Sequence, residues 1–147
     1  MALWPQQRQT CHMAFQTAPI KVFLADDSIP VRDRVAGMLR EQHMAVVGQA
    51  HTPGASIDGI LATRPDVVVL DIQLHGGSGL DVLRTVRLVA PQIAFVILSN
   101  NSGPAYRKLF RMEGARQFLD KSNEFGQLAR AVEQAMHPVA DQMLSDD

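Results

Sequence analysis

Three acidic residues, one hydroxyl and one lysine stand where short apolar runs of this sequence end. Asp26 and Asp27 follow the run IKVFLA, and Asp71 follows VVVL. Ser99 follows IAFVIL, and Lys121 comes two residues after the shorter run QFL. Short β-branched runs are typical of strands buried on both faces, as in a parallel sheet. Open α/β sheets bind their ligands at the carboxyl ends of the strands. We therefore expect these five side chains to meet at one edge of a sheet.

Such a cluster predicts phosphoryl chemistry assisted by a metal. Carboxylates ~4 Å apart repel by roughly 4 kcal/mol per pair at an effective dielectric constant of ~20. A divalent cation relieves this repulsion, and oxygen ligands favour Mg²⁺, with Mn²⁺ as the second choice. A carboxylate beside that metal and an ammonium can attack phosphorus and form an aspartyl-phosphate. The metal and Lys121 would offset charge on the phosphoryl oxygens, to which the Ser99 hydroxyl could donate.

The elements that must position these residues are predicted by patterns along the chain. Apolar runs predict strands at 20–25, 44–50, 67–70, 93–98 and 117–119. Amphipathic patterns predict helices that begin at Ser28, near Thr52, at Gly79, at Ser102 and near Phe125. Five strands that alternate with five helices indicate parallel pairing. We expect an α/β fold, a flavodoxin-like doubly wound five-stranded parallel sheet of order 2-1-3-4-5, with the second and fifth strands at its edges.

Bulk composition bounds the class of protein. The chain has 147 residues, 46% hydrophobic and 20% charged, a net charge of −1 and one cysteine, Cys11. These values predict one globular domain with no internal disulfide and no overall field that favours nucleic acid or membrane. We expect a flexible extension over 1–19, a folded domain over 20–137 and a tail over 138–147. No apolar run is long enough to span a bilayer, so we expect a cytoplasmic protein.

Four motifs in register carry a family resemblance. LADDS, VVVLDIQLHGGSGLDVL, VILSN and FLDKS, in this order and spacing, resemble the receiver domain of bacterial two-component response regulators. The similarity covers about residues 20–136, and the variants GGSGLDVL and LDKS are closest to receivers of LuxR/NarL-type regulators. It implies a signalling protein that accepts a phosphoryl group, not a dedicated enzyme.

The resemblance also implies a role for each motif residue. Asp71 would be the phospho-acceptor and, with Asp27, a direct ligand of Mg²⁺. Asp26 would assist through water, and the backbone carbonyl of Gln73 would complete the protein ligands. Lys121 would contact the oxygens of the acyl-phosphate.

Two further residues would act as the switch of such a domain. Ser99 would move toward the phosphoryl group. Phe118, three residues before Lys121, would follow into the vacated space and change the surface of the fourth helix and fifth strand.

Two features depart from this pattern or lie outside it. His75 stands where the family usually has proline, so we expect a less rigid loop after Asp71. Arg107, Lys108 and Arg111 form a basic patch on the fourth predicted helix, which we interpret as a solvated face rather than a dedicated site.

The expected partners follow from the resemblance. They are a histidine kinase or histidine phosphotransfer protein as donor and a downstream protein as target, with a monomer or a phosphorylation-dependent dimer as the oligomeric state. A LuxR-type output domain needs roughly 60 residues, and few follow the last predicted helix. We expect a single-domain receiver or part of a longer regulator, without direct DNA binding by this chain.

Three alternatives stay open. The first is a degenerate receiver that serves only as a protein-interaction module. The second is a Mg²⁺-dependent phosphohydrolase of the haloacid dehalogenase type, which would need a D-x-D motif after the first strand and a cap insertion. The third is a flavodoxin-like flavin binder, in which Asp26 and Asp27 would repel the phosphate.

Overall fold

A five-stranded parallel sheet forms the centre of the molecule. The computed structural model describes residues 18–137, and its sheet has the order β2-β1-β3-β6-β7. The strands are β1 (Lys21–Ala25), β2 (Ala45–Ala50), β3 (Val67–Leu70), β6 (Ala94–Ser99) and β7 (Gln117–Asp120). All their pairings are parallel. The predicted fold and strand order are confirmed, with β2 and β7 at the edges. Strand ends differ from the prediction by one residue at most.

The helices begin where the sequence supplies caps. The α-helices of the described residues are α2 (Ile29–Glu41), α3 (Pro53–Thr63), α4 (Gly79–Val89), α5 (Pro104–Met112) and α6 (Leu128–Ala135), the last preceded by a 3-10 turn, η1 (Phe125–Gln127). The side chains of Ser28, Thr52 and Ser78 each accept a backbone N–H from the first turn of the helix that follows. The start of α5 differs from the prediction, because Gly103 and not Ser102 is its N-cap residue.

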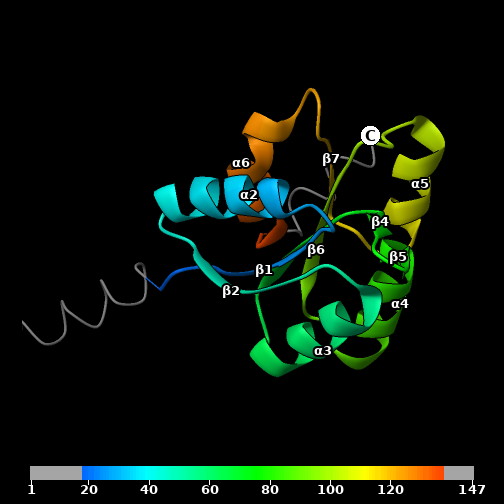
Figure 1. Cartoon of the computed structure of the whole chain (residues 1–147), viewed down its shortest axis with the longest axis horizontal. Helices are drawn as coiled ribbons and strands as arrows, with labels where there is room; N and C mark the ends of the chain where they lie inside the picture. The colour runs from blue at the N-terminus through cyan, green and yellow to red at the C-terminus, as the bar shows by residue number, and fades with distance from the viewer. Residues whose placement is uncertain (1–17, 138–147) are drawn as a thin grey trace, which may run out of the picture.

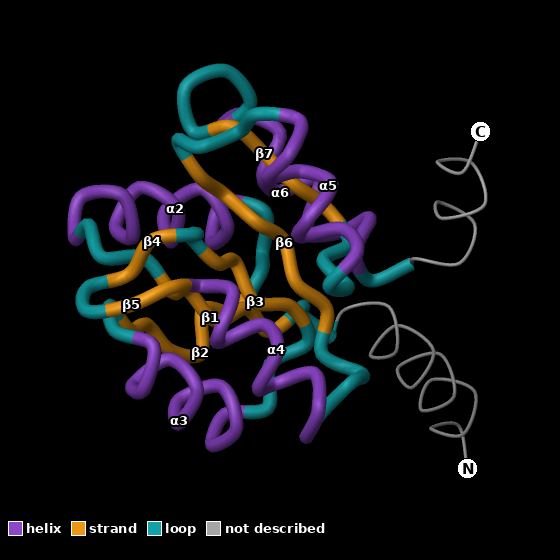
Figure 2. The backbone as a smooth tube through the Cα atoms, turned by 90° about the vertical axis from the view of Figure 1, so that its right-hand side faces the viewer, coloured by secondary structure: helices purple, strands orange, loops and turns teal. Residues whose placement is uncertain are grey.

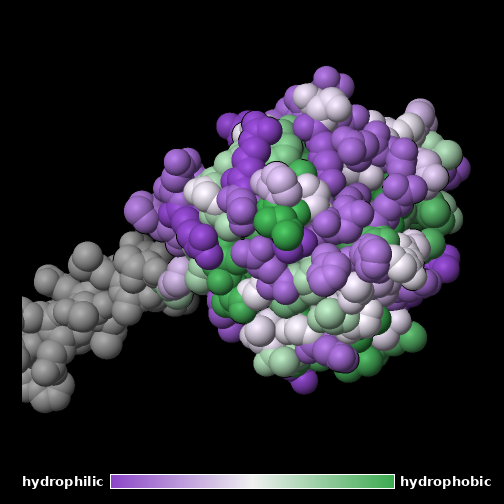
Figure 3. All heavy atoms as spheres, viewed as in Figure 1, coloured by the Kyte–Doolittle hydropathy of each residue, from purple (hydrophilic) through white to green (hydrophobic). Residues whose placement is uncertain are grey.

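Helices cover both faces of the sheet. Figure 1 shows α2 and α6 on one side and α3 and α4 on the other, and Figure 2 shows the same layers after a quarter turn. Each side has its own buried cluster, one built around Leu24, Leu39 and Leu128 and the other around Phe23, Phe95 and Phe110. The outer surface seen in Figure 3 is mostly hydrophilic, with small apolar patches between polar side chains.

A short hairpin after β3 was absent from the predicted elements. β4 (Gln73–Leu74) and β5 (Gly77–Ser78) pair antiparallel, with His75 and Gly76 between them. The backbone N–H of His75 donates to the carbonyl of His51 at 2.8 Å. The loop that follows Asp71 is therefore folded and attached to the end of β2.

Two expectations concern residues 1–17 and 138–147, so the predicted N-terminal extension and C-terminal tail lie largely or wholly outside the described residues. Within residues 18–137, no helix combines the length and the apolar character needed to cross a membrane.

Candidate phosphoryl-acceptor site

Strand register brings the acidic residues together. Ala25 of β1 stands opposite Leu70 of β3, so the next residues, Asp26 and Asp71, leave the sheet side by side. Both carboxylates are buried, with relative exposures of 6% and 7%, while Asp27 is exposed. A carboxylate oxygen from each of the three residues lies within 4.8 Å of the others. The sequence prediction of an acidic cluster at this edge is confirmed as a geometric arrangement.

Lys121 reaches the same cluster from beyond the end of β7. Its Nζ lies 2.7 Å from Asp26 Oδ2 and 2.9 Å from Asp71 Oδ2. Its backbone N–H donates to the carbonyl of Ser99 at 3.0 Å, which fixes where the side chain begins. One ammonium thus contacts two of the three carboxylates, and the cluster keeps an excess of negative charge.

Burial and charge act in opposite directions on the ionisation of these groups. Burial raises the pKa of Asp71 above its usual value, and the ammonium of Lys121, which lowers it, offsets this only in part; the neighbouring Asp26 raises it further. Burial lowers the pKa of Lys121, but the hydrogen bonds and charges of Asp26 and Asp71 outweigh burial, so the net pKa is raised. The lysine therefore stays charged at neutral pH and favours the ionised form of Asp71.

The remaining carboxylate oxygens suit a hard divalent cation. Lys121 contacts the Oδ2 atoms of Asp26 and Asp71. Within residues 18–137, Asp26 Oδ1 accepts only the backbone N–H of Ser28, at 2.9 Å, and Asp71 Oδ1 accepts only a long hydrogen bond from the N–H of Gln73, at 3.5 Å. Each of these oxygens has a further lone pair, and Asp27 is accessible. Oxygen donors and uncompensated negative charge are what Mg²⁺ requires, so the donor set fits this ion.

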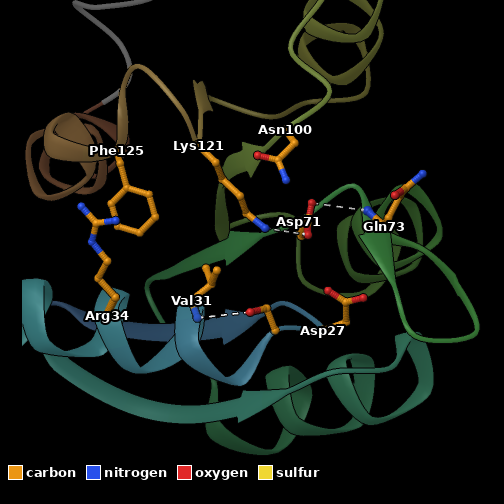
Figure 4. Close-up of a pocket in the computed structure, with 9 residues that line it drawn as sticks. Asp27, Val31, Arg34, Asp71, Gln73, Asn100, Lys121 and Phe125 are labelled. Atoms are coloured by element: carbon orange, nitrogen blue, oxygen red, sulfur yellow. Dashed lines mark hydrogen bonds and ion pairs between the residues drawn. The ribbon is translucent and has the colours of Figure 1, made fainter.

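A pocket of about 360 Å³ opens over Asp71. It is lined by Asp27, Ser28, Val31, Arg34, Asp71, Gln73, Asn100, Lys121 and Phe125. Figure 4 shows Asp71 and Lys121 pointing toward each other in its centre, with Asp27 and Gln73 to one side. The opposite wall is a pair that the sequence analysis did not identify, Arg34 stacked on the ring of Phe125 at 4.1 Å from Cζ to the ring centroid. The sequence pattern predicts Phe125 only as the start of the last helix.

The predicted switch residues lie beside the pocket rather than in its lining. Ser99 is 2% exposed, and its Oγ accepts the N–H of Asn101 at 3.1 Å. Phe118 is half-buried on β7, with its ring 6.1 Å from that of Phe110 in an edge-to-face arrangement. Its ring also faces the guanidinium of Arg107 at 5.1 Å. The interpretation of Arg107 as part of a solvated face is wrong, whereas Lys108 and Arg111 are exposed as predicted.

Comparison with known proteins decides the family. Residues 22–133 match the model of the response regulator receiver domain. The chain belongs to this family. Receiver domains act in phosphorelay signalling and bind Mg²⁺ through an acidic pocket, and the cluster of Asp26, Asp27 and Asp71 corresponds to such a pocket.

The relatives that share this receiver domain include a transcriptional activator and a methylesterase. It is 32% identical over 114 residues to the DNA-binding transcriptional activator DevR/DosR of Mycobacterium tuberculosis, covering 77% of this chain and 52% of that protein. It is also 32% identical over 107 residues to a protein-glutamate methylesterase/protein-glutamine glutaminase of Geobacter metallireducens, covering 71% of this chain and 30% of the relative.

A solved receiver domain has the same fold. The signal receiver domain of the putative response regulator NarL from Mycobacterium tuberculosis superimposes with a TM-score of 0.76 at 28% identity, covering 81% of this chain and 97% of that one. The chain spans between 32% and 59% of the length of four curated relatives that it matches. The similarity therefore concerns the receiver portion of those proteins.

Proposed function

We propose that this receiver domain accepts a phosphoryl group on Asp71 from a histidine kinase or a histidine phosphotransfer protein. The observation that supports this most directly is the position of Asp71, buried at the floor of an open pocket with Lys121 Nζ 2.9 Å from its Oδ2. A carboxylate oxygen of Asp71 would attack phosphorus while the bond from phosphorus to the imidazole nitrogen of the donor breaks. The electron pair of that bond leaves with the imidazole, and an acyl-phosphate forms.

The chain's own residues would assist this transfer. Lys121 would turn from the carboxylates to the phosphoryl oxygens, where its positive charge offsets the negative charge that develops there. Asp27, Asp71 and the backbone carbonyl of Gln73 would hold Mg²⁺ directly and Asp26 through water, with Mn²⁺ as a substitute. The bound ion would supply charge neutralisation to the same oxygens.

The signal would leave through Ser99 and Phe118. The Ser99 hydroxyl would donate to a phosphoryl oxygen, and Phe118 would move with it, so that the surface formed by α5 and β7 changes for a downstream protein. The domain would function as a phosphoryl acceptor that reverts by hydrolysis, not as a dedicated enzyme. A phosphorylated form that elutes as a dimer in size-exclusion chromatography, beside a monomeric unphosphorylated form, would assign the oligomeric state.

One experiment tests the acceptor. The protein is incubated with acetyl phosphate with and without Mg²⁺, and intact mass is measured for wild type, Asp71→Asn and the matched control Asp58→Asn, which alters an exposed carboxylate on α3. We expect Mg²⁺-dependent gain of one phosphoryl group in wild type and Asp58→Asn only. A gain that persists in Asp71→Asn would assign the acceptor elsewhere. No gain with any phosphodonor would favour a degenerate receiver.

A further inference from the structure

Arg107, on α5, joins three separate segments of the chain. Its Nε donates to the carbonyl of Ser102 at 2.9 Å, and its Nη1 donates to the carbonyl of Phe118 at 3.1 Å. Its Nη2 forms an ion pair with Glu124 Oε1 at 2.7 Å. The guanidinium also faces the ring of Phe118. Because the donors of an arginine form a rigid fork, these contacts fix the three segments relative to one another.

A second set of hydrogen bonds, centred on Asp120, joins the same segments. The hydroxyl of Ser102 donates to a carboxylate oxygen of Asp120. The other oxygen of Asp120 accepts the backbone N–H groups of Ser122 and Asn123, at 2.6 and 3.1 Å. Glu124 Oε1, besides pairing with Arg107, accepts the N–H of Asp120 at 2.8 Å. The loop after β6 and the loop after β7 are therefore linked through polar side chains on the α5 side of the sheet.

These two loops carry Asn100 and Lys121, which line the acceptor pocket. Ser99 is three residues before Ser102, and its hydroxyl accepts the N–H of Asn101 in the same loop. Lys121 directly follows Asp120, and its backbone N–H bonds to the carbonyl of Ser99. Movement of the Ser99 hydroxyl toward Asp71 would break its bond with the N–H of Asn101, in the loop that Arg107 holds through the carbonyl of Ser102.

We propose that Arg107 is a positioning residue, which restrains the loop 100–103 and Phe118 together and so couples phosphoryl acceptance at Asp71 to the surface of α5 and β7. This inference rests on the proposed function of Asp71. An arginine that served only to cover the edge strand β7 would need no more than the bond to the carbonyl of Phe118 or the ion pair with Glu124. Arg107 instead has partners on both loops that flank the pocket, at Ser102 and Glu124, and on the backbone and ring of Phe118 between them.

The proposed restraint predicts the direction in which the affinity for a phosphoryl mimic changes. If the loop must leave Arg107 for Ser99 to reach a phosphoryl oxygen, then part of the free energy of phosphoryl binding is used to break the Arg107 contacts. Arg107→Ala removes these contacts beforehand, so beryllofluoride, a phosphoryl mimic, should bind about fivefold more tightly with Mg²⁺ present. Arg107→Lys keeps the ion pair but loses the fork, and its affinity should lie between those of wild type and Arg107→Ala.

The test combines affinity with hydrogen exchange. Beryllofluoride affinity is measured by calorimetry for wild type, both Arg107 variants and Arg111→Ala, an exposed arginine on the same helix. Amide exchange of the loop 100–103 and of β7 is measured without the ligand. We expect faster exchange in both segments for Arg107→Ala, slower exchange in wild type, and wild-type values of both quantities for Arg111→Ala.

Two results would overturn the inference while leaving the acceptor role intact. One is an Arg107→Ala protein of reduced stability whose beryllofluoride affinity stays within twofold of wild type, since a purely structural residue gives that outcome. The other is unchanged exchange of the loop 100–103. Failure of wild type itself to bind beryllofluoride would instead overturn the proposed function, and this inference with it.

Discussion

Lys121 and Asp71, 50 residues apart in the sequence, are joined by a bond of 2.9 Å between Nζ and Oδ2. The bond links the carboxyl ends of β3 and β7, which lie on either side of β6 in the sheet. It also offsets in part the burial that raises the pKa of Asp71. The same ammonium therefore positions the carboxylate and favours its ionised form, and an ionised carboxylate is the form that attacks phosphorus.

Replacement of Lys121 should affect the rate of phosphorylation and its dependence on pH. Lys121→Met keeps much of the apolar stem and removes the charge, so acyl-phosphate formation from acetyl phosphate should slow by at least about tenfold. The pKa of Asp71 should rise further, because the ammonium lowers it in wild type. An acid of higher pKa is ionised only at higher pH, so the acidic limb of the rate profile should move toward neutral pH. Initial rates measured from acidic to neutral pH give both quantities.

The matched control for this variant is Lys108→Met, which removes an exposed ammonium on α5. It should keep the wild-type rate and pH profile. A Lys121→Met protein that behaves like Lys108→Met would mean that the bond to Asp71 has no part in the transfer.

The arrangement of the main strands could be predicted because it depends on short-range patterns. Each apolar run ends at a polar residue, and the alternation of strands and helices restricts the sheet to few topologies. Once Ala25 pairs with Leu70, the positions of Asp26 and Asp71 follow without further information.

The contacts of the arginines could not be predicted in this way. Arg34 and Arg107 sit on helices with polar faces, where the sequence pattern indicates solvent. A long side chain reaches several partners, and which one it meets depends on loops whose conformation the pattern does not determine. The β4–β5 hairpin was missed for another reason, because strands of two residues are too short to show a period of two.

Proline in place of His75 should loosen this hairpin rather than stiffen it. The N–H of His75 donates to His51 at 2.8 Å, and proline has no N–H to donate. We expect His75→Pro to be about 1 kcal/mol less stable than His75→Ala, which keeps the backbone bond. Urea denaturation of the two variants measures this difference, and amide exchange at Gln73 and Leu74 should be faster in the proline variant. A His75→Pro protein more stable than His75→Ala would show that the bond contributes little.

The ion pair of Arg107 and Glu124 should make a pH-dependent contribution to stability. The hydrogen bond from Arg107, followed by that from the N–H of Asp120, lowers the pKa of Glu124 below its usual value. A carboxyl group whose pKa is lower in the folded state contributes stability above its unfolded pKa, and this contribution is lost as pH falls through the folded pKa. Glu124→Gln should therefore destabilise the protein at pH 7 by about 0.5–1 kcal/mol, the range expected for a partly exposed pair.

The same substitution should have almost no effect at acidic pH below the lowered pKa of Glu124, where this residue is protonated in both the folded and the unfolded state. Urea denaturation of wild type and Glu124→Gln at neutral and acidic pH measures the two differences. Glu133→Gln, an exposed change on α6, serves as a control for loss of negative charge alone. An equal loss of stability at both pH values would exclude ionisation of Glu124 as the cause.

Gly79 and Gly37, both helical, should respond in opposite directions to alanine. A Cβ at Gly79, the first residue of α4, would overlap the backbone carbonyl oxygen of Asp71, whereas a Cβ at Gly37 in α2 would meet no atom within 4 Å. Gly79→Ala should cost about 1–3 kcal/mol, because backbone must move to admit the methyl group. Gly37→Ala should gain about 0.5–1 kcal/mol from reduced backbone entropy. In urea denaturation the two midpoints should shift in opposite directions at a common slope.

Because the displaced backbone belongs to the acceptor itself, Gly79→Ala should also slow phosphorylation of Asp71, and Gly37→Ala should not. Alanine at Gly79 without cost to stability or rate would mean that α4 can move away from Asp71 without disturbing the site.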